Sequence, residues 1–304
     1  MTRDRTSKGY KTHFDQLHYD IPHQTHPVLC LLYLLSLHSP TPSHNIMSDD
    51  WFSSKLAPEQ ENHPEEVEAL EDYLRQKTTA TEAAQAITRP VVTADCPRDD
   101  LSRLHILLLD ALVELPDHTE LLLALLQAIE NLPEPDFAAV QPTKRPQEKL
   151  WKGLPHFANR WYDVSYRSGS WKMDAEAASG PKRDTLRDEH VRKAEVEARL
   201  VMAGLAGIPI DWGYEVIDDA LGSDALLDFE VPAAAEWFAI CGQRFQQGAE
   251  EGEKSYVLKN EWMSLKRWSL WEARLRELQA QSGVVQRAAT KALNAIHEAE
   301  RERS

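Results

Sequence analysis

The densest group of acid and base side chains in the sequence is Asp188-Glu189-His190. An imidazole beside carboxylates could act as a general base or help to bind a metal ion. However, the surrounding pattern places the three residues in the first turn of a predicted helix, where the helix dipole and capping favour carboxylates. We therefore interpret the group as a helix start and expect no catalytic residue in it.

The other residue types that commonly perform chemistry are scattered along the chain. Phosphate-binding, dinucleotide-binding, nucleophile-elbow and H-E-x-x-H motifs are absent from the sequence. Its three cysteines, Cys30, Cys96 and Cys241, form no C-x-x-C pair, and Cys241 lies on the apolar face of a predicted helix. We accordingly expect no catalytic residue, no cofactor and no metal site, and we lean against an enzyme.

Tryptophan is the most unusual feature, with nine residues in the chain. Four of them, Trp237, Trp262, Trp268 and Trp271, lie close together in the sequence. Apolar residues over 258–278 recur every three or four positions, which predicts one broad apolar face on a helix. Packing is the simplest use of that face, and a ligand pocket or a groove for a partner's helix are the alternatives. We take the four tryptophans as the candidate binding surface.

The elements that must position these residues are helices. From residue 64 onward the apolar positions repeat every three or four residues, and almost no stretch has the two-residue period of a strand. Proline, acidic residues and glycine at the expected ends predict helices over residues 64–77, 81–88, 99–115, 117–132, 185–205, 211–221, 232–245, 256–280 and 284–299.

The predicted fold class is all-α, a succession of antiparallel helix hairpins packed into one helical domain. Residues 133–146 contain four prolines and are the place where a split into two subdomains remains open.

Composition and charge exclude several classes of protein. The 304 residues include 34 basic and 49 acidic side chains, a formal charge of −15, and 42% of them are hydrophobic. Residues 47–138 carry 20 acidic and 6 basic side chains, whereas residues 256–304 carry 6 and 9. The negative charge argues against a nucleic-acid partner, because binding to phosphate backbones relies on Lys and Arg. The few cysteines favour a reducing, cytoplasmic location.

The first 46 residues differ from the remainder, since they hold six of the twelve histidines and have a net charge of +1. Their apolar run at residues 28–37 is too short to span a bilayer, and no typical cleavage site follows it, so we disfavour secretion and a membrane location. We interpret residues 1–46 as an extension that is disordered or precedes the true start at Met47. Residues 47–63 are predicted to be a flexible lead-in, and residues 64–300 the helical domain.

Six segments follow one another in a characteristic order. They are TEAAQAIT (81–88), the leucine-rich hairpin (100–133), KLWKGLPHF (149–157), VEARLVMAGL (196–205), VPAAAEWFAICGQRF (231–245) and LKRWSLWEARL (265–275). In this order they resemble a fungal family known as domain of unknown function 3632, over residues 64–300. The resemblance implies a fungal source and an all-helical fold, and it brings no established activity or catalytic residue.

Helix content, absent catalytic motifs and uneven charge together favour a non-catalytic, helical protein-interaction module. Its binding surface would be the acidic helices of residues 64–131 or the tryptophan face at residues 262–271. The alternative is a small-molecule-binding protein or enzyme whose pocket is built from dispersed residues such as Trp237, Arg199 and His156.

Overall fold

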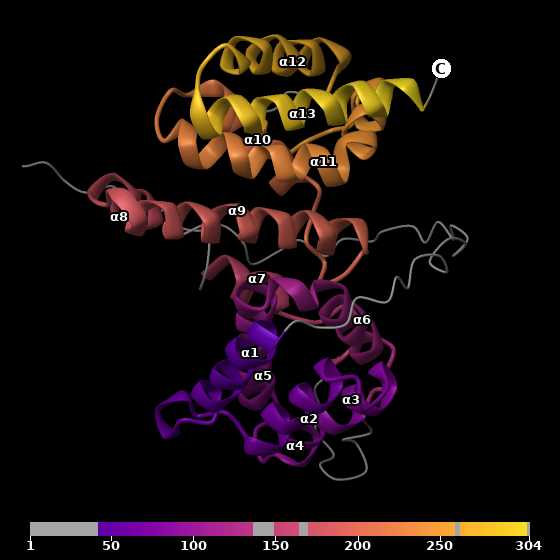
Figure 1. Ribbon diagram of the computed structural model, residues 1–304. Helices are drawn as coiled ribbons and strands as arrows, with labels where there is room; N and C mark the ends of the chain where they lie inside the picture. The colour runs from indigo at the N-terminus through magenta and orange to yellow at the C-terminus, as the bar shows by residue number, and fades with distance from the viewer. Residues whose placement is uncertain (1–41, 136–148, 164–169, 259–261, 303–304) are drawn as a thin grey trace, which may run out of the picture. The chain divides into compact units, whose positions relative to one another are not determined.

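The computed structural model describes residues 42–135, 149–163, 170–258 and 262–302 (Figure 1). The regular elements in these ranges are helices, and the one pairing of strand type is an isolated antiparallel bridge between Lys254 and Trp262. The all-α expectation is therefore confirmed. Residues 43–304 form one compact unit. The predicted extension at residues 1–46 falls almost wholly outside the described residues.

The longer helices follow one another along the chain with short connections. They are α1 (Pro42–Lys55), α2 (Pro64–Leu74), α3 (Ala80–Ile87), α4 (Arg89–Thr93), α5 (Pro97–Glu114), α6 (Thr119–Glu130), α7 (Phe157–Trp161), α8 (Ser170–Ala177), α9 (Gly180–Met202), α10 (Asp211–Gly222), α11 (Leu227–Glu251), α12 (Leu265–Gln279) and α13 (Gly283–Arg301). Single 3-10 turns lie at Pro58–Gln60 and Pro116–His118. No described helix combines the length and the apolar character needed to cross a bilayer.

Local signals explain several of the helix ends. Pro64 begins α2, with acidic side chains in its first turn. The α3 helix has a capping box, in which the Thr79 hydroxyl accepts from the Glu82 backbone N–H and the Glu82 carboxylate accepts from the Thr79 N–H. Helix α5 ends at Glu114, two residues before Pro116, in agreement with the predicted stop at that proline.

Three predicted helix starts are wrong. The α9 helix begins at Gly180 and not at residue 185, and α12 begins at Leu265 and not at residue 256. Pro232 was expected to begin a helix, yet it lies inside α11. Tertiary packing explains this case, because Phe229 and Val231, which precede the proline, are fully buried and hold the first turn in place.

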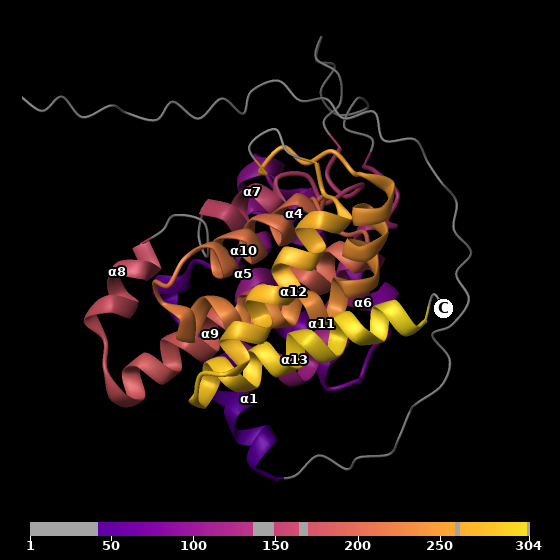
Figure 2. The same cartoon turned by 90° about the horizontal axis from the view of Figure 1, so that it is seen from above.

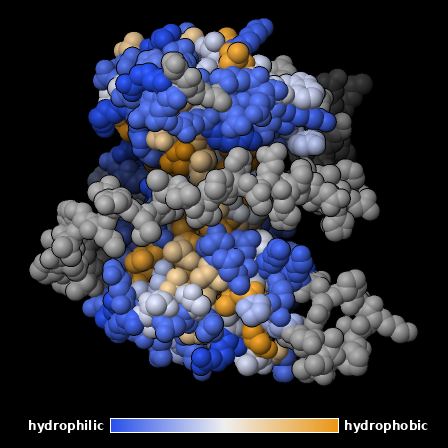
Figure 3. Space-filling model, turned by 90° about the vertical axis from the view of Figure 1, so that its right-hand side faces the viewer, coloured by the Kyte–Doolittle hydropathy of each residue, from blue (hydrophilic) through white to orange (hydrophobic). Residues whose placement is uncertain are grey.

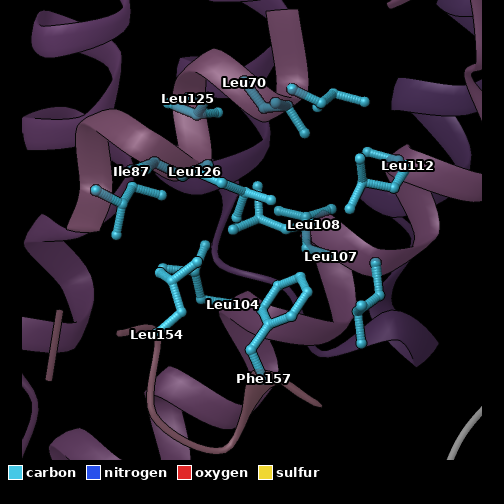
Figure 4. Close-up of a cluster of buried hydrophobic side chains, with 14 of the residues drawn as sticks. Leu70, Ile87, Leu104, Leu107, Leu108, Leu112, Leu125, Leu126, Leu154 and Phe157 are labelled. Atoms are coloured by element: carbon cyan, nitrogen blue, oxygen red, sulfur yellow. The ribbon is translucent and has the colours of Figure 1, made fainter. Parts of the chain in front are cut away.

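The first hydrophobic core is formed by the N-terminal helices. In Figure 4, leucines from α5 lie against side chains from α2, α3 and α6, and Leu154 and Phe157 close the cluster from the other side. The α5–α6 hairpin is thus packed among other helices, as its almost continuous leucines predict.

The segment expected to be a flexible lead-in contributes to this core. Within residues 47–63, Trp51 and Phe52 on α1 are buried, and the Trp51 Nε1–H donates to Glu114 of α5 at 2.5 Å. The expectation of a flexible lead-in is corrected for this part, because it belongs to α1 and packs two aromatic side chains into the core.

The second core is formed by α9 to α13, with α11 in contact with each of the other four. Helix α9 serves both cores, because Val196 and Leu200 join the first and Ala194 and Ala198 the second. Figure 1 shows α9 between the two groups of helices. The two cores therefore meet at α9. Most of the split proposed near residues 133–146 falls outside the described residues.

The side of the molecule shown in Figure 3 has an uneven surface. The C-terminal helices at the top present mostly hydrophilic side chains, whereas hydrophobic ones gather below them, towards α9 and the N-terminal helices.

Candidate functional site

The four tryptophans of the candidate surface do not share one environment. Trp237, Trp268 and Trp271 are 0%, 3% and 4% exposed, whereas Trp262 is 57% exposed. The Phe238 ring makes T-shaped contacts with Trp268 and Trp271, each at 6.0 Å between ring centroids. The prediction of one binding surface is wrong for the three buried residues. Their periodicity correctly indicates an apolar face, but α11 and α13 of the same chain cover that face.

The opposite side of α12 is exposed and carries a mixture of apolar and charged residues. We define the outer face as Trp262, Leu265, Lys266, Leu270, Ala273 and Glu277, all of which are exposed. Leu265 and Leu270 are 54% and 60% exposed. Figures 1 and 2 show α12 on the outside of the C-terminal group of helices. This face offers a partner an apolar strip flanked by charges.

His190 lies well inside α9 and not in its first turn, so the capping interpretation of Asp188-Glu189-His190 is wrong. The imidazole is buried, stacks on Trp171 of α8 at 3.9 Å between ring centroids, and places Nε2 3.6 Å from the Glu230 carboxylate of α11. The Lys172 ammonium lies 3.2 Å from the other Glu230 oxygen. Three helices thus bring an imidazole, a carboxylate, an ammonium and an indole together.

The electrostatics of this group are set by Glu230. Burial raises the pKa of Glu230, but the hydrogen bonds and charges of His190 and Lys172 lower it by more, so the carboxyl pKa lies below its usual value. A cavity of about 30 Å³ adjoins the group, lined by Trp171, Leu186, Glu189, His190, Lys193 and Phe229. It has room for about one water molecule and none for a substrate.

A larger hollow lies between α11 and α13. It has a volume of about 430 Å³, opens widely to solvent and is lined by Ala239, Arg287, Thr290, Lys291, Asn294, Ala295 and Glu298. Lys291 makes an ion pair with Glu236 at 2.6 Å. Ligand pockets are usually concave and mostly apolar, so this open, polar hollow is a poor candidate for one.

The dispersed pocket considered from the sequence is not assembled at either hollow. Trp237 is in the second core, Arg199 pairs with Glu120 at 2.6 Å, and His156 is exposed just before α7. None of these three residues lines either hollow.

The comparison with known families agrees with the order of motifs. The family model described as "Protein of unknown function (DUF3632)" matches residues 106–275. The chain belongs to the DUF3632 family. The DUF3632 match runs from α5 into α12 and includes parts of both cores, within the wider range of 64–300 expected from the sequence. No curated protein and no solved structure matches the chain significantly.

One DUF3632 segment, KLWKGLPHF, is held by carboxylates from the end of α6 and the residues after it. The Glu134 carboxylate accepts hydrogen bonds from the backbone N–H groups of Leu150, Trp151 and Lys152 at 2.7–3.1 Å. The Glu130 carboxylate accepts one from the backbone N–H of Gly153 at 3.0 Å. This arrangement of successive N–H groups is an anion-binding nest, occupied here by the chain's own side chain. We therefore assign it a structural role.

Several ionisable groups in the DUF3632 region and beside it are buried. Glu197 accepts a hydrogen bond from Trp161 Nε1 at 2.6 Å, and both residues are fully buried. Burial lowers the pKa of His105 to about 3 and raises that of the Cys241 thiol to about 12, so neither group is ionised at neutral pH.

Cys241 is buried on the apolar face of its helix, as predicted. Among the described residues, no group of three His, Cys, Asp or Glu side chains could hold a metal ion.

A sequence signal for these groups exists. Glu66 stands four residues before Leu70 and seven before Tyr73, so it lies on the same buried stripe of α2. Glu197 likewise follows Ala194 by three residues on α9. A polar residue that interrupts an apolar stripe at helical spacing is the feature to look for.

Proposed function

We propose that this DUF3632 chain is a non-catalytic helical module that binds another protein through the outer face of α12. The observation that carries the proposal is the exposure of Trp262, Leu265 and Leu270, each above half of its surface. Clustered apolar exposure of this kind is typical of contact surfaces. An amphipathic helix of the partner would suit this face, since α12 is itself an exposed helix.

The two hollows of the described residues support a binding role over a catalytic one. The His190 group has no space for a substrate beside it, and the hollow between α11 and α13 is open and polar. The acidic residues 47–138 argue against nucleic acid as the partner. The thiols of Cys96 and Cys241 are unpaired with each other, which supports our proposal of a reducing, cytoplasmic setting.

Affinity capture with the full chain tests the binding face. We expect the wild type to retain a reproducible partner that the Trp262→Asp and Leu270→Asp variants lose, because a carboxylate on the face cannot be desolvated without cost. Met173→Asp is the matched control, since Met173 is 74% exposed on α8 and outside the face. A partner that both the Trp262→Asp and the Leu270→Asp variants retain would rule out this face. Variants of Trp268 or Trp271 are unsuitable, because they would disturb the core.

The contacts of α8 favour a second candidate function, binding of a small aromatic amine. Trp171 supplies a ring that lies on His190 and Phe229, and Lys172 supplies an ammonium that pairs with Glu230. Together they occupy a slot between α9 and α11 as a ligand with a ring and an amine would. In this view α8 and such a ligand compete for one site.

Tryptamine, which combines an indole with an ammonium, tests the second candidate. We expect millimolar tryptamine to raise the melting temperature of a Trp171→Ala/Lys172→Ala variant, because a ligand that binds only the folded state stabilises it. The same variant with Glu230→Gln added should respond much less, since it lacks the carboxylate for the amine. Equal responses, or none, would exclude a slot specific for this chemistry.

A further inference from the structure

We propose that the protein that binds the outer face of α12 is a second copy of this chain, with the two α12 helices antiparallel. The inference rests on the proposed function, because it uses the same face. It adds the identity of the partner and the register of the contact.

The residues of the outer face are arranged in a regular pattern along α12. Lys266, Leu270, Ala273 and Glu277 are separated by four, three and four residues, so they form one stripe along the helix, and all four are exposed. A cation stands at one end of the stripe, an anion at the other, and two apolar residues between them. The two ends of the stripe therefore carry opposite charges.

Reversing the direction of an identical stripe makes it complementary to itself. In an antiparallel pair, Lys266 of each copy lies opposite Glu277 of the other, and Leu270 of each lies opposite Ala273 of the other. This gives two ion pairs and two apolar contacts around a two-fold axis, which is the commonest symmetry of homodimers. A parallel pair would instead place like charges against each other.

The sizes of the side chains also suit this contact. Ala273 has a short side chain, which lets a second helix approach to about 8–10 Å and gives Leu270 a place to pack. At the N-terminal end, Trp262 and Leu265 extend the apolar area towards the C-terminal end of the other α12, where Ala280 and Gln281 are exposed. These flanking residues enlarge a contact that one pair of helices alone would leave small.

Neighbouring charges remain compatible with the pairing. Arg274 donates to Glu277 at 3.0 Å, and Arg276 donates to Glu272 at 2.5 Å. The Glu277 side chain is nevertheless 68% exposed, so its carboxylate is accessible to a lysine of another copy. The stripe runs from Lys266 to Glu277, twelve residues along the helix and about 16 Å from first to last. A contact of this length favours a reversible dimer with a dissociation constant in the micromolar range.

Sedimentation velocity of the full chain over a range of micromolar concentrations tests the inference. We expect a monomer–dimer equilibrium whose dissociation constant rises about 100-fold or more in Leu270→Asp, because both copies lose an apolar contact and bury a charge. Lys266→Glu should raise it about 10-fold, since two attractive pairs become repulsive. Lys266→Glu/Glu277→Lys should return it to within about 3-fold of the wild type, because the swap restores both pairs.

The outcomes separate the inference from the proposed function. Circular dichroism first establishes that each variant is folded. A monomeric wild type, or a dimer that the charge swap does not restore, overturns the antiparallel pairing. If the monomer still retains another protein that Leu270→Asp releases, the proposed function stands and only the second copy is excluded.

Discussion

Replacing Trp237 by alanine is expected to lower the free energy of unfolding by about 3–5 kcal/mol. The indole is fully buried in the second core, with its ring centroid 6.1 Å from that of Phe245. The side chains around Trp237 are tightly packed, because a Cβ atom added to Gly213 would lie 2.6 Å from both Trp237 Cε3 and Phe245 Cζ. Removing the indole therefore leaves a cavity that the rigid surroundings cannot fill.

Urea unfolding followed by circular dichroism measures this loss, with Trp262→Ala as the matched control. Trp262 is more than half exposed, so its replacement should change the free energy of unfolding by no more than about 0.5 kcal/mol. Similar losses in the two variants would contradict the assignment of Trp237 to the core and Trp262 to the surface.

Replacing Glu66 by glutamine is expected to stabilise the chain at pH 8 by about 2–3 kcal/mol and to change it little near pH 4. Burial raises the pKa of Glu66 from 4.5 to about 7, although Arg103 and His63 oppose the rise. Its Oε1 accepts from Arg103 at 2.8 Å, whereas Oε2 has no hydrogen-bond partner among the described residues. The folded state therefore favours the protonated carboxyl.

The sign of the pH dependence follows from the direction of this shift. The folded pKa of Glu66 lies above the unfolded value, so its contribution to stability is complete below about pH 4.5 and is lost as the pH rises through 7. Glutamine is neutral throughout and keeps an oxygen for Arg103. Urea unfolding of the wild type and of Glu66→Gln measures this difference. Between pH 5 and pH 8 the free energy of unfolding should fall less in the variant than in the wild type.

Glu82→Gln is a control with the opposite sign. Hydrogen bonds from Thr79 lower the pKa of Glu82, so its contribution is present above its unfolded pKa and is lost as the pH falls. The glutamine variant should therefore be less stable than the wild type at pH 8. If Glu66→Gln is also less stable than the wild type at pH 8, the stabilisation from the ion pair with Arg103 outweighs the cost of burying the carboxylate.

The helices could be predicted from the sequence because periodicity and end signals are local. Pro64 and the leucines of α5 specify their helices without help from distant residues. The starts of α9, α11 and α12 could not be placed in this way. In α11, for example, burial of Phe229 and Val231 extends the helix ahead of Pro232, and that burial depends on packing.

The candidate sites were harder to predict for the same reason. The spacing of Trp268 and Trp271 indicates an apolar face, but it cannot tell whether α13 or another protein covers that face. His190 meets Trp171 and Glu230 from two other helices, which no motif in the sequence connects. The order of six segments along the chain is the sequence feature that indicates the DUF3632 family, and the family match at residues 106–275 agrees with it.

Hydroxyl-radical footprinting of the assembled protein tests the central claim that the outer face of α12 is the contact surface. We expect Trp262, Leu265 and Leu270 to become protected as the chain associates with its partner, whether a second copy or another protein. Met173 should stay reactive, because it lies on α8 outside the face. Unchanged reactivity at these three residues of the outer face in a demonstrated complex would contradict the claim.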